Sequence, residues 1–144
     1  MACEPEILRE VPLFALLDED EWIVMKQHTA WGGEFLRGRP GFELAAAVAD
    51  AHHERWDGMG YPRGLRERDI PQAATIVAVA DSFDAMTNDR PYRIGHSIDW
   101  ALQEISAGSG TQFNPTVVEA LMRAHEHGNL PIAPSPERVT PRAA

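Results

Sequence analysis

The sequence contains only one cysteine and one lysine among its 144 residues, and it has no long apolar run. The single cysteine, Cys3, excludes a disulfide within the chain and fits a reducing compartment. No stretch approaches the ~20 apolar residues that a membrane span needs. The N-terminus also does not have the basic start and apolar core of a secretory signal. We therefore expect a cytoplasmic protein with no membrane partner.

Positive charge is also scarce, because 13 Lys and Arg residues stand against 22 Asp and Glu residues, giving a net charge of −9. This balance argues against a general binder of nucleic acid or of anionic membranes. It leaves a phosphate ligand open, since local clusters set the local potential. Lys26 is the only lysine, and the guanidinium groups of the remaining basic residues suit bidentate contacts with phosphate.

No segment alternates polar and apolar residues as a β-strand does, so we predict an all-α fold. The pattern predicts five helices, at about 18–36, 42–53, 71–87, 98–107 and 115–127. Acidic residues crowd the first turn of the first helix, where the helix dipole favours anions. Ser97 and Asn114 are expected N-caps, and Pro71 and Pro115 are expected in first turns. Residues 56–70 are rich in glycine and proline and are expected to form a loop.

The histidines near the end of the second predicted helix are the first candidates for chemistry. Adjacent helical side chains point about 100° apart, so His52 and His53 can converge only on something near the helix end. A metal ion is one such partner, and His28 could supply a third nitrogen. Asp81 is expected to point inward beside the apolar stripe that contains Ile76. From the residues alone, ordinary hydrogen-bonded histidines and an Asp81–arginine pair remain open.

Four strings resemble, in order, the conserved blocks of the HD-GYP domain family, bacterial hydrolases of cyclic dinucleotides. They are EWIVMKQHTAWGGEFL at 21–36, HHERWDGMGYPRGL at 52–65, VAVADSFDAMTNDRPYR at 77–93 and GSGTQFNP at 108–115. The similarity extends from about Leu17 to His125. It implies a bundle of helices around a centre of two or three metal ions, usually iron or manganese, and hydrolysis of cyclic di-GMP.

The resemblance also implies roles for individual residues. His28, His52 and His53 match three ligands of one metal ion, and Asp81 matches the carboxylate that binds the other. Gly60, Tyr61 and Pro62 match the GYP loop beside the substrate, where Tyr61 would stack on a guanine or donate its hydroxyl. Arg90 and Arg93 match residues that meet the phosphates or bases of the ligand.

The sequence departs from the family because the adjacent His-Asp pair and a nearby lysine are not found in it. We therefore expect a partial HD-superfamily bundle over residues 18–128, a junction-like segment over 1–17 and a disordered tail over 129–144. We expect at most one metal ion per chain, no certain catalytic residue, and exposed stripes at Trp22, Met25 and Ile76. Such stripes favour a homo-oligomer or a complementing chain. An inactive cyclic-dinucleotide-binding or protein-interaction module, or a gene remnant, remains the alternative to an enzyme.

Overall fold

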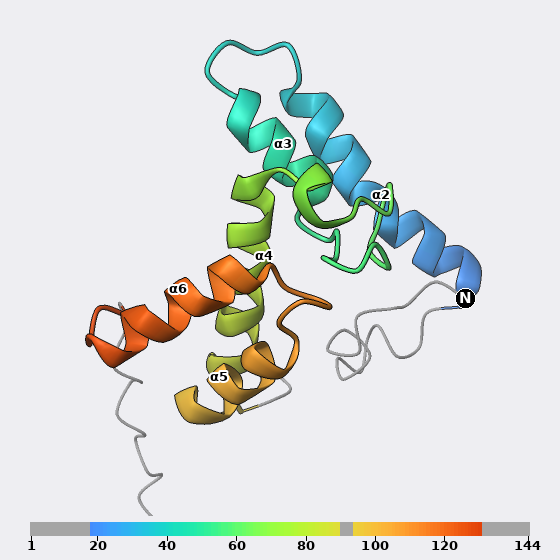
Figure 1. Cartoon of the computed structure of the whole chain (residues 1–144). Coiled ribbons are helices and arrows are strands. Elements are labelled where there is room, and N and C mark those ends of the chain that lie inside the picture. Colours follow the sequence, from blue (N-terminus) through green and yellow to red (C-terminus); the bar gives the residue numbers. More distant parts are fainter. Residues whose placement is uncertain (1–17, 90–93, 131–144) are drawn as a thin grey trace, which may run out of the picture.

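The structure, a computed structural model, describes residues 18–89 and 94–130, and this part is all-α, as predicted (Figure 1). Five α-helices and one short 3-10 turn, η2 (Glu67–Asp69), make up its regular structure. The helices are α2 (Glu19–Leu36), α3 (Glu43–Ala51), α4 (Gln72–Thr87), α5 (Ile98–Ala107) and α6 (Pro115–Glu126). Four predicted features lie outside the described residues, namely segment 1–17, Arg90, Arg93 and the tail from residue 131.

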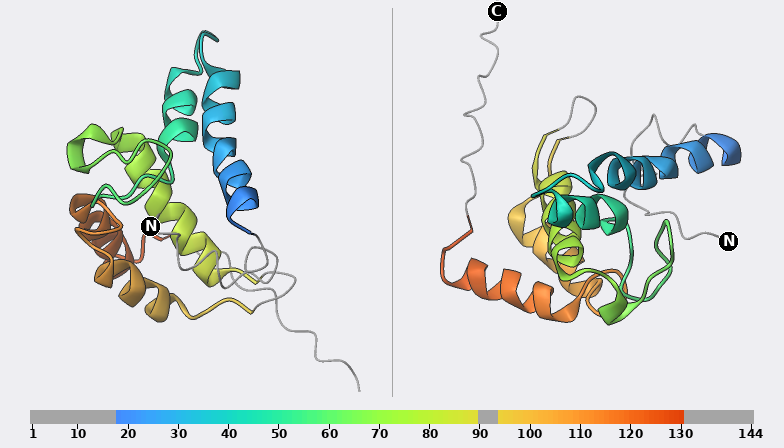
Figure 2. Two further views of the ribbon diagram at one scale, coloured as in Figure 1. Left: turned by 90° about the vertical axis from the view of Figure 1, so that its right-hand side faces the viewer. Right: turned by 90° about the horizontal axis from the view of Figure 1, so that it is seen from above.

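Helix α4 is the central element that connects two groups of helices. Helices α2 and α3 form an antiparallel pair toward one end of α4, α5 packs toward the other end, and α6 meets α4 nearer its middle (Figures 1 and 2). Within the described ranges, no helix combines the length and apolar character needed to cross a bilayer.

Capping residues fix the helix starts close to where the sequence predicted them. Asp18 accepts a hydrogen bond from the backbone N–H of Glu21, whose side chain returns the bond and completes a capping box. Ser97 and Asn114 also cap their helices with side-chain oxygens, as expected. Helix α4 begins one residue after Pro71. Helix α3 covers Glu43–Ala51, so the helix predicted over 42–53 began one residue too early and ended two residues too late.

Two apolar clusters hold the described helices together. The larger lies between α4, α5 and α6 and consists of Val79, Met86, Ala101, Ile105, Phe113 and Val118. The smaller joins the end of α3 to the start of α4 through Ala51, Ile70 and Ala74, with Trp56 and Leu65 packed against them. Because Trp56 and Leu65 belong to the intervening loop, this loop is packed against the helices at both its ends.

Asp81 was expected to point inward from α4, and this prediction was wrong, because Asp81 is exposed whereas Val79 and Met86 are each 2% exposed. The expected exposure of Ile76 is confirmed, at 49%. Alanine and valine occur around most of this helix, so periodicity could not identify the face on which α5 and α6 pack. Trp22, expected to be exposed, is buried at 5% exposure.

Candidate metal centre

Three imidazole rings from α2 and the end of α3 lie close together. The ring centroid of His28 is 5.6 Å from that of His52 and 5.1 Å from that of His53, and the latter two centroids are 4.1 Å apart. One possible ligand atom from each residue lies within 4.8 Å of the other two. Nitrogens on one ion at ~2.1 Å are roughly 3–4 Å apart, so small ring rotations would let all three bind it.

Backbone carbonyls orient two of these rings. The Nδ1 atom of His28 is 2.6 Å from the carbonyl oxygen of Met25. The Nδ1 atom of His52 is 3.1 Å from the carbonyl oxygens of both Val48 and Ala49. A carbonyl can only accept, so each Nδ1 carries the proton and donates it. In the neutral ring the lone pair is then on Nε2, the arrangement typical of a metal-binding histidine.

The third ring is held in its neutral form by its surroundings. Burial, together with the neighbouring His52 and His28, lowers the pKa of His53 to about 3. A neutral imidazole has the lone pair that metal binding requires, whereas the protonated ring has none. His28 is exposed, and His52 and His53 are half-buried, so the cluster is accessible from solvent.

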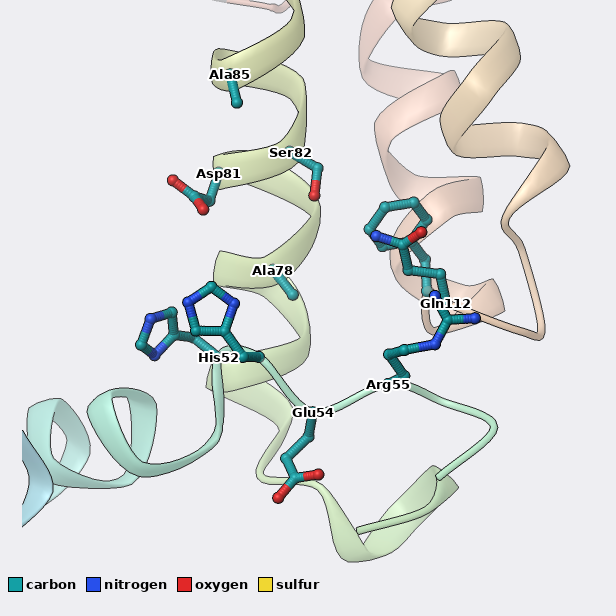
Figure 3. Close-up of a pocket in the computed structure, with 10 residues that line it drawn as sticks. His52, Glu54, Arg55, Ala78, Asp81, Ser82, Ala85 and Gln112 are labelled. Carbon is teal, nitrogen blue, oxygen red and sulfur yellow. The ribbon is translucent and has the colours of Figure 1, made fainter. Parts of the chain in front are cut away.

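Asp81 lies beside the histidines but outside their cluster. It lines a pocket that also contains His52 and His53, and it extends into that pocket from α4 (Figure 3). Within the described residues, the three histidines alone meet the geometric condition for a shared ion. Asp81 is therefore not a fourth member of the histidine cluster. Its exposed carboxylate faces the pocket that His52 and His53 also line.

The loop that contains Gly60, Tyr61 and Pro62 folds back onto the histidine pair. The ring of Tyr61 stacks on that of His53, with centroids 4.8 Å apart and an angle of 21° between the planes. Tyr61 is 8% exposed, its hydroxyl has no hydrogen-bond partner among the residues that the structure describes, and burial raises its pKa. Pro62 is exposed. In this structure the tyrosine ring thus faces a candidate metal ligand, and the proline faces solvent.

Sequence reasoning missed several residues that shape the pocket. Glu54 is 4% exposed, and its carboxylate accepts the backbone N–H groups of Arg63 and Leu65 at 2.8 and 2.9 Å. Arg55 donates two hydrogen bonds to Asp57, which hold the pKa of that carboxyl below its ordinary value. Glu54 and Arg55 lie in the matched string at 52–65, but nothing in their spacing indicated that they would be buried or half-buried. Gln112 lines the opposite wall of the pocket (Figure 3).

Comparison of the sequence with protein families agrees with the helical fold and the histidine cluster. Residues 15–117 match the family model described as HD domain, and the chain belongs to this family. The resemblance drawn from the four strings is thereby confirmed at the level of the family.

Similar proteins with known activities are phosphodiesterases of cyclic dinucleotides. The chain is 49% identical over 110 residues to a cyclic di-GMP phosphodiesterase of Thermotoga maritima, covering 75% of this chain and 30% of that protein. It is 47% identical to the cyclic di-GMP phosphodiesterase response regulator RpfG of Xanthomonas campestris, covering 74% and 29% respectively. The chain therefore spans less than a third of the length of these curated relatives.

A solved structure gives the same result. The crystal structure of a cyclic GMP-AMP-specific phosphodiesterase from Vibrio cholerae superposes with a TM-score of 0.60 and 28% sequence identity. The alignment covers 81% of this chain and 27% of the Vibrio chain. The described helices are thus similar to one portion of a larger phosphodiesterase.

Proposed function

We propose that this chain binds a divalent metal ion at His28, His52 and His53 and forms the metal-binding part of a phosphohydrolase. The substrate class we propose is cyclic di-GMP or a related cyclic dinucleotide. The observation that carries the proposal is the convergence of three imidazoles with free ring nitrogens in a member of the HD domain family. The relatives named above act on cyclic di-GMP or cyclic GMP-AMP, which supports the substrate class.

The donor set fits a first-row transition metal. Neutral imidazole nitrogens suit zinc, iron and nickel better than calcium. Iron or manganese is the ion we propose, because the resemblance to the HD-GYP family implies it. When bound, the ion would polarise a phosphoryl oxygen and lower the pKa of a coordinated water. His28 and His52 would present Nε2, and Asp81 is the carboxylate proposed for a second, weaker position.

Residues outside the cluster are proposed to bind the nucleotide. Arg90 and Arg93 would meet its phosphates, since guanidinium groups pair bidentately with phosphate oxygens. The loop with Gly60, Tyr61 and Pro62 is proposed to lie beside the ligand, with the exposed Pro62 nearest to solvent. Together these groups could bind a cyclic dinucleotide without acting on its transition state.

An assay of hydrolysis tests the proposed function. The purified 144-residue chain, loaded with Mn²⁺ or with Fe²⁺ under anaerobic conditions, is expected to bind cyclic di-GMP weakly and to hydrolyse it slowly or not at all. Each group that stabilises transition-state charge is worth roughly 10²–10³ in rate, and this sequence has neither the His-Asp pair nor the nearby lysine of the resembled family. Turnover at about 1 s⁻¹ or faster, abolished by His52→Ala, would show that these three histidines suffice.

A binding module without catalysis is the second candidate. It is favoured by the cluster itself, because no carboxylate of the described residues joins the three histidines. Ligand binding without turnover in every metal would support this reading. Turnover that appears only on mixing with a second chain, or that rises with self-association in size-exclusion chromatography, would instead indicate a complementing subunit or a homo-oligomer.

A further inference from the structure

His53 differs from the other two histidines in what orients its ring. The rings of His28 and His52 are each fixed by a hydrogen bond from Nδ1 to a carbonyl of their own helix. Among the described residues, no hydrogen-bond partner is found for either ring nitrogen of His53. A histidine whose ring rotates freely loses that freedom when it binds a metal ion, and this loss weakens binding. Another contact that already fixes the ring of His53 would remove this cost.

Tyr61 is the residue positioned to do this. Its ring lies 4.8 Å from that of His53, nearly parallel to it, and its backbone N–H donates to the carbonyl oxygen of His53 at 3.2 Å. The tyrosine is therefore joined to His53 through both its backbone and its ring. The ammonium of Lys26 lies 5.5 Å from the centroid of the Tyr61 ring and adds a cation–π contact from α2.

Two features hold Tyr61 itself against the histidine. A Cβ atom at Gly60 would collide with the backbone of residues 53–55, so glycine allows the loop to approach this closely. The buried carboxylate of Glu54 accepts the N–H groups of Arg63 and Leu65, which ties the far side of the loop to the residue after His53. A buried carboxylate must be satisfied by such bonds, and the loop conformation supplies them.

From these contacts we infer that Tyr61 and Glu54 are positioning residues that fix the ring of His53 for metal binding, Tyr61 by stacking and Glu54 by anchoring the loop. The inference rests on the proposed metal site and assigns the buried tyrosine a task separate from nucleotide contact. It requires the aromatic ring of Tyr61 and not its hydroxyl, which has no partner in the described structure.

Titration with Co²⁺ alone, followed by its visible absorption, tests the inference. We expect Tyr61→Leu to weaken Co²⁺ binding by about tenfold or more, the usual size of such supporting effects, and to change the absorption band. Tyr61→Phe retains the ring and should bind within about twofold of the parent chain, by the same scale. Glu54→Gln, which offers one acceptor oxygen in place of two, should shift the affinity in the same direction as Tyr61→Leu.

A matched control separates positioning from general stability. Val118 is buried in the larger apolar cluster between α4, α5 and α6, outside the loop of Tyr61, so Val118→Ala should lower the melting temperature without changing Co²⁺ affinity by more than about twofold. Equal losses of affinity in Val118→Ala and Tyr61→Leu would overturn the inference. So would a folded Tyr61→Leu variant that binds Co²⁺ as tightly as the parent.

A second measurement does not depend on the ion. In chelator-treated protein, the ring protons of His53 should carry an NMR shift from the Tyr61 ring current that persists in Tyr61→Phe and disappears in Tyr61→Leu. An unchanged spectrum in the leucine variant would overturn the inference while leaving the metal site intact. A parent chain that binds no Co²⁺ would overturn the proposed function and this inference together.

Discussion

The Nδ1 atom of His28 lies 2.6 Å from the carbonyl oxygen of Met25, so this ring is oriented by the helix that carries it. The same helix brings it to within 5.1–5.6 Å of the other two rings. The α2–α3 pair thus places one proposed ligand on each of its two helical segments. In the neutral form of either ring, the hydrogen bond from Nδ1 leaves Nε2 to bind a metal ion.

Replacing His28 with alanine should therefore weaken metal binding by about 100-fold or more, because a ligand is lost outright and even supporting residues are worth about 10- to 100-fold. Isothermal titration with Mn²⁺ or Co²⁺ measures this. His127→Ala is the matched control, since His127 is exposed and its Nδ1 is likewise 2.7 Å from a carbonyl oxygen, that of Arg123, outside the cluster. Equal affinity in the two variants would exclude His28 as a ligand.

The number of tightly bound ions should not exceed one per chain. Three histidines alone satisfy the geometry of a shared ion among the described residues, and Asp81 lies apart from them. Elemental analysis after loading with iron or manganese and removal of loosely bound metal decides the number. Asp81→Asn should leave this first ion in place. Two or more ions per chain would contradict the prediction and would identify Asp81 as the first candidate for a second position.

Acid should destabilise the metal-free chain through His53. The pKa of His53 is lowered from 6.5 to about 3, so the folded state binds fewer protons than the unfolded state between these values. Above pH 6.5 the ring is neutral in both states and the free energy of unfolding is unaffected by its titration. As the pH falls from 6.5 toward 3, the unfolded state gains a proton that the folded state does not, so the free energy of unfolding decreases. Between pH 6.5 and pH 5 the loss should be at most ~2 kcal/mol.

Urea unfolding in the presence of a chelator, at several pH values, measures this loss. His53→Gln, which cannot titrate, should show a smaller change in the free energy of unfolding over the same pH interval. Parallel pH profiles for the two proteins would mean that other groups cause the acid sensitivity.

Two adjacent glycines of α2 should respond differently to the same substitution. A Cβ at Gly33 would collide with the carboxylate of Asp50 on α3, which pairs with Arg37 at 2.6 Å. A Cβ at Gly32 would instead meet the Cβ of Ala49 at 3.4 Å, an ordinary contact. In a helix, Gly→Ala alone contributes about +1 kcal/mol of stability, so Gly32→Ala should be neutral or stabilising.

Gly33→Ala should be less stable than Gly32→Ala by up to about 1 kcal/mol, because the Asp50 carboxylate must rotate away and give up its ion pair with Arg37. Thermal unfolding of the two variants in parallel measures the difference. If Gly33→Ala proved at least as stable as Gly32→Ala, the ion pair between Asp50 and Arg37 would contribute nothing measurable to stability.

Helix positions could be predicted from the sequence because their signals are local. The capping pair of Asp18 and Glu21, and the Asn114–Pro115 pair, each act within one helical turn. The inward face of α4 could not be predicted, because apolar residues surround most of that helix and only the positions of α5 and α6 decide which are buried. Local sequence carries no information on those positions.

The part of the candidate site that could be predicted is the part that lies in the recognised sequence motifs. His52 and His53 stand out as a pair, and the resemblance connected them to His28, which the structure brings alongside. The contact between Tyr61 and His53 was not predictable, since it depends on a loop that reverses direction over several residues. The same holds for Glu54, whose hydrogen-bond partners lie 9 and 11 residues further along the chain.

The position of His28 on one helix and His52 at the end of the next has a mechanical consequence. An ion bound by both would cross-link the chain across the α2–α3 pair, as a disulfide closes a loop. Closing a loop of this size restricts the unfolded chain by on the order of 3 kcal/mol in the disulfide model. Metal loading should therefore slow amide hydrogen exchange in α2 and α3 much more than in α5 and α6, which have an apolar core of their own. The ion would then serve as a structural staple for one half of the described fold.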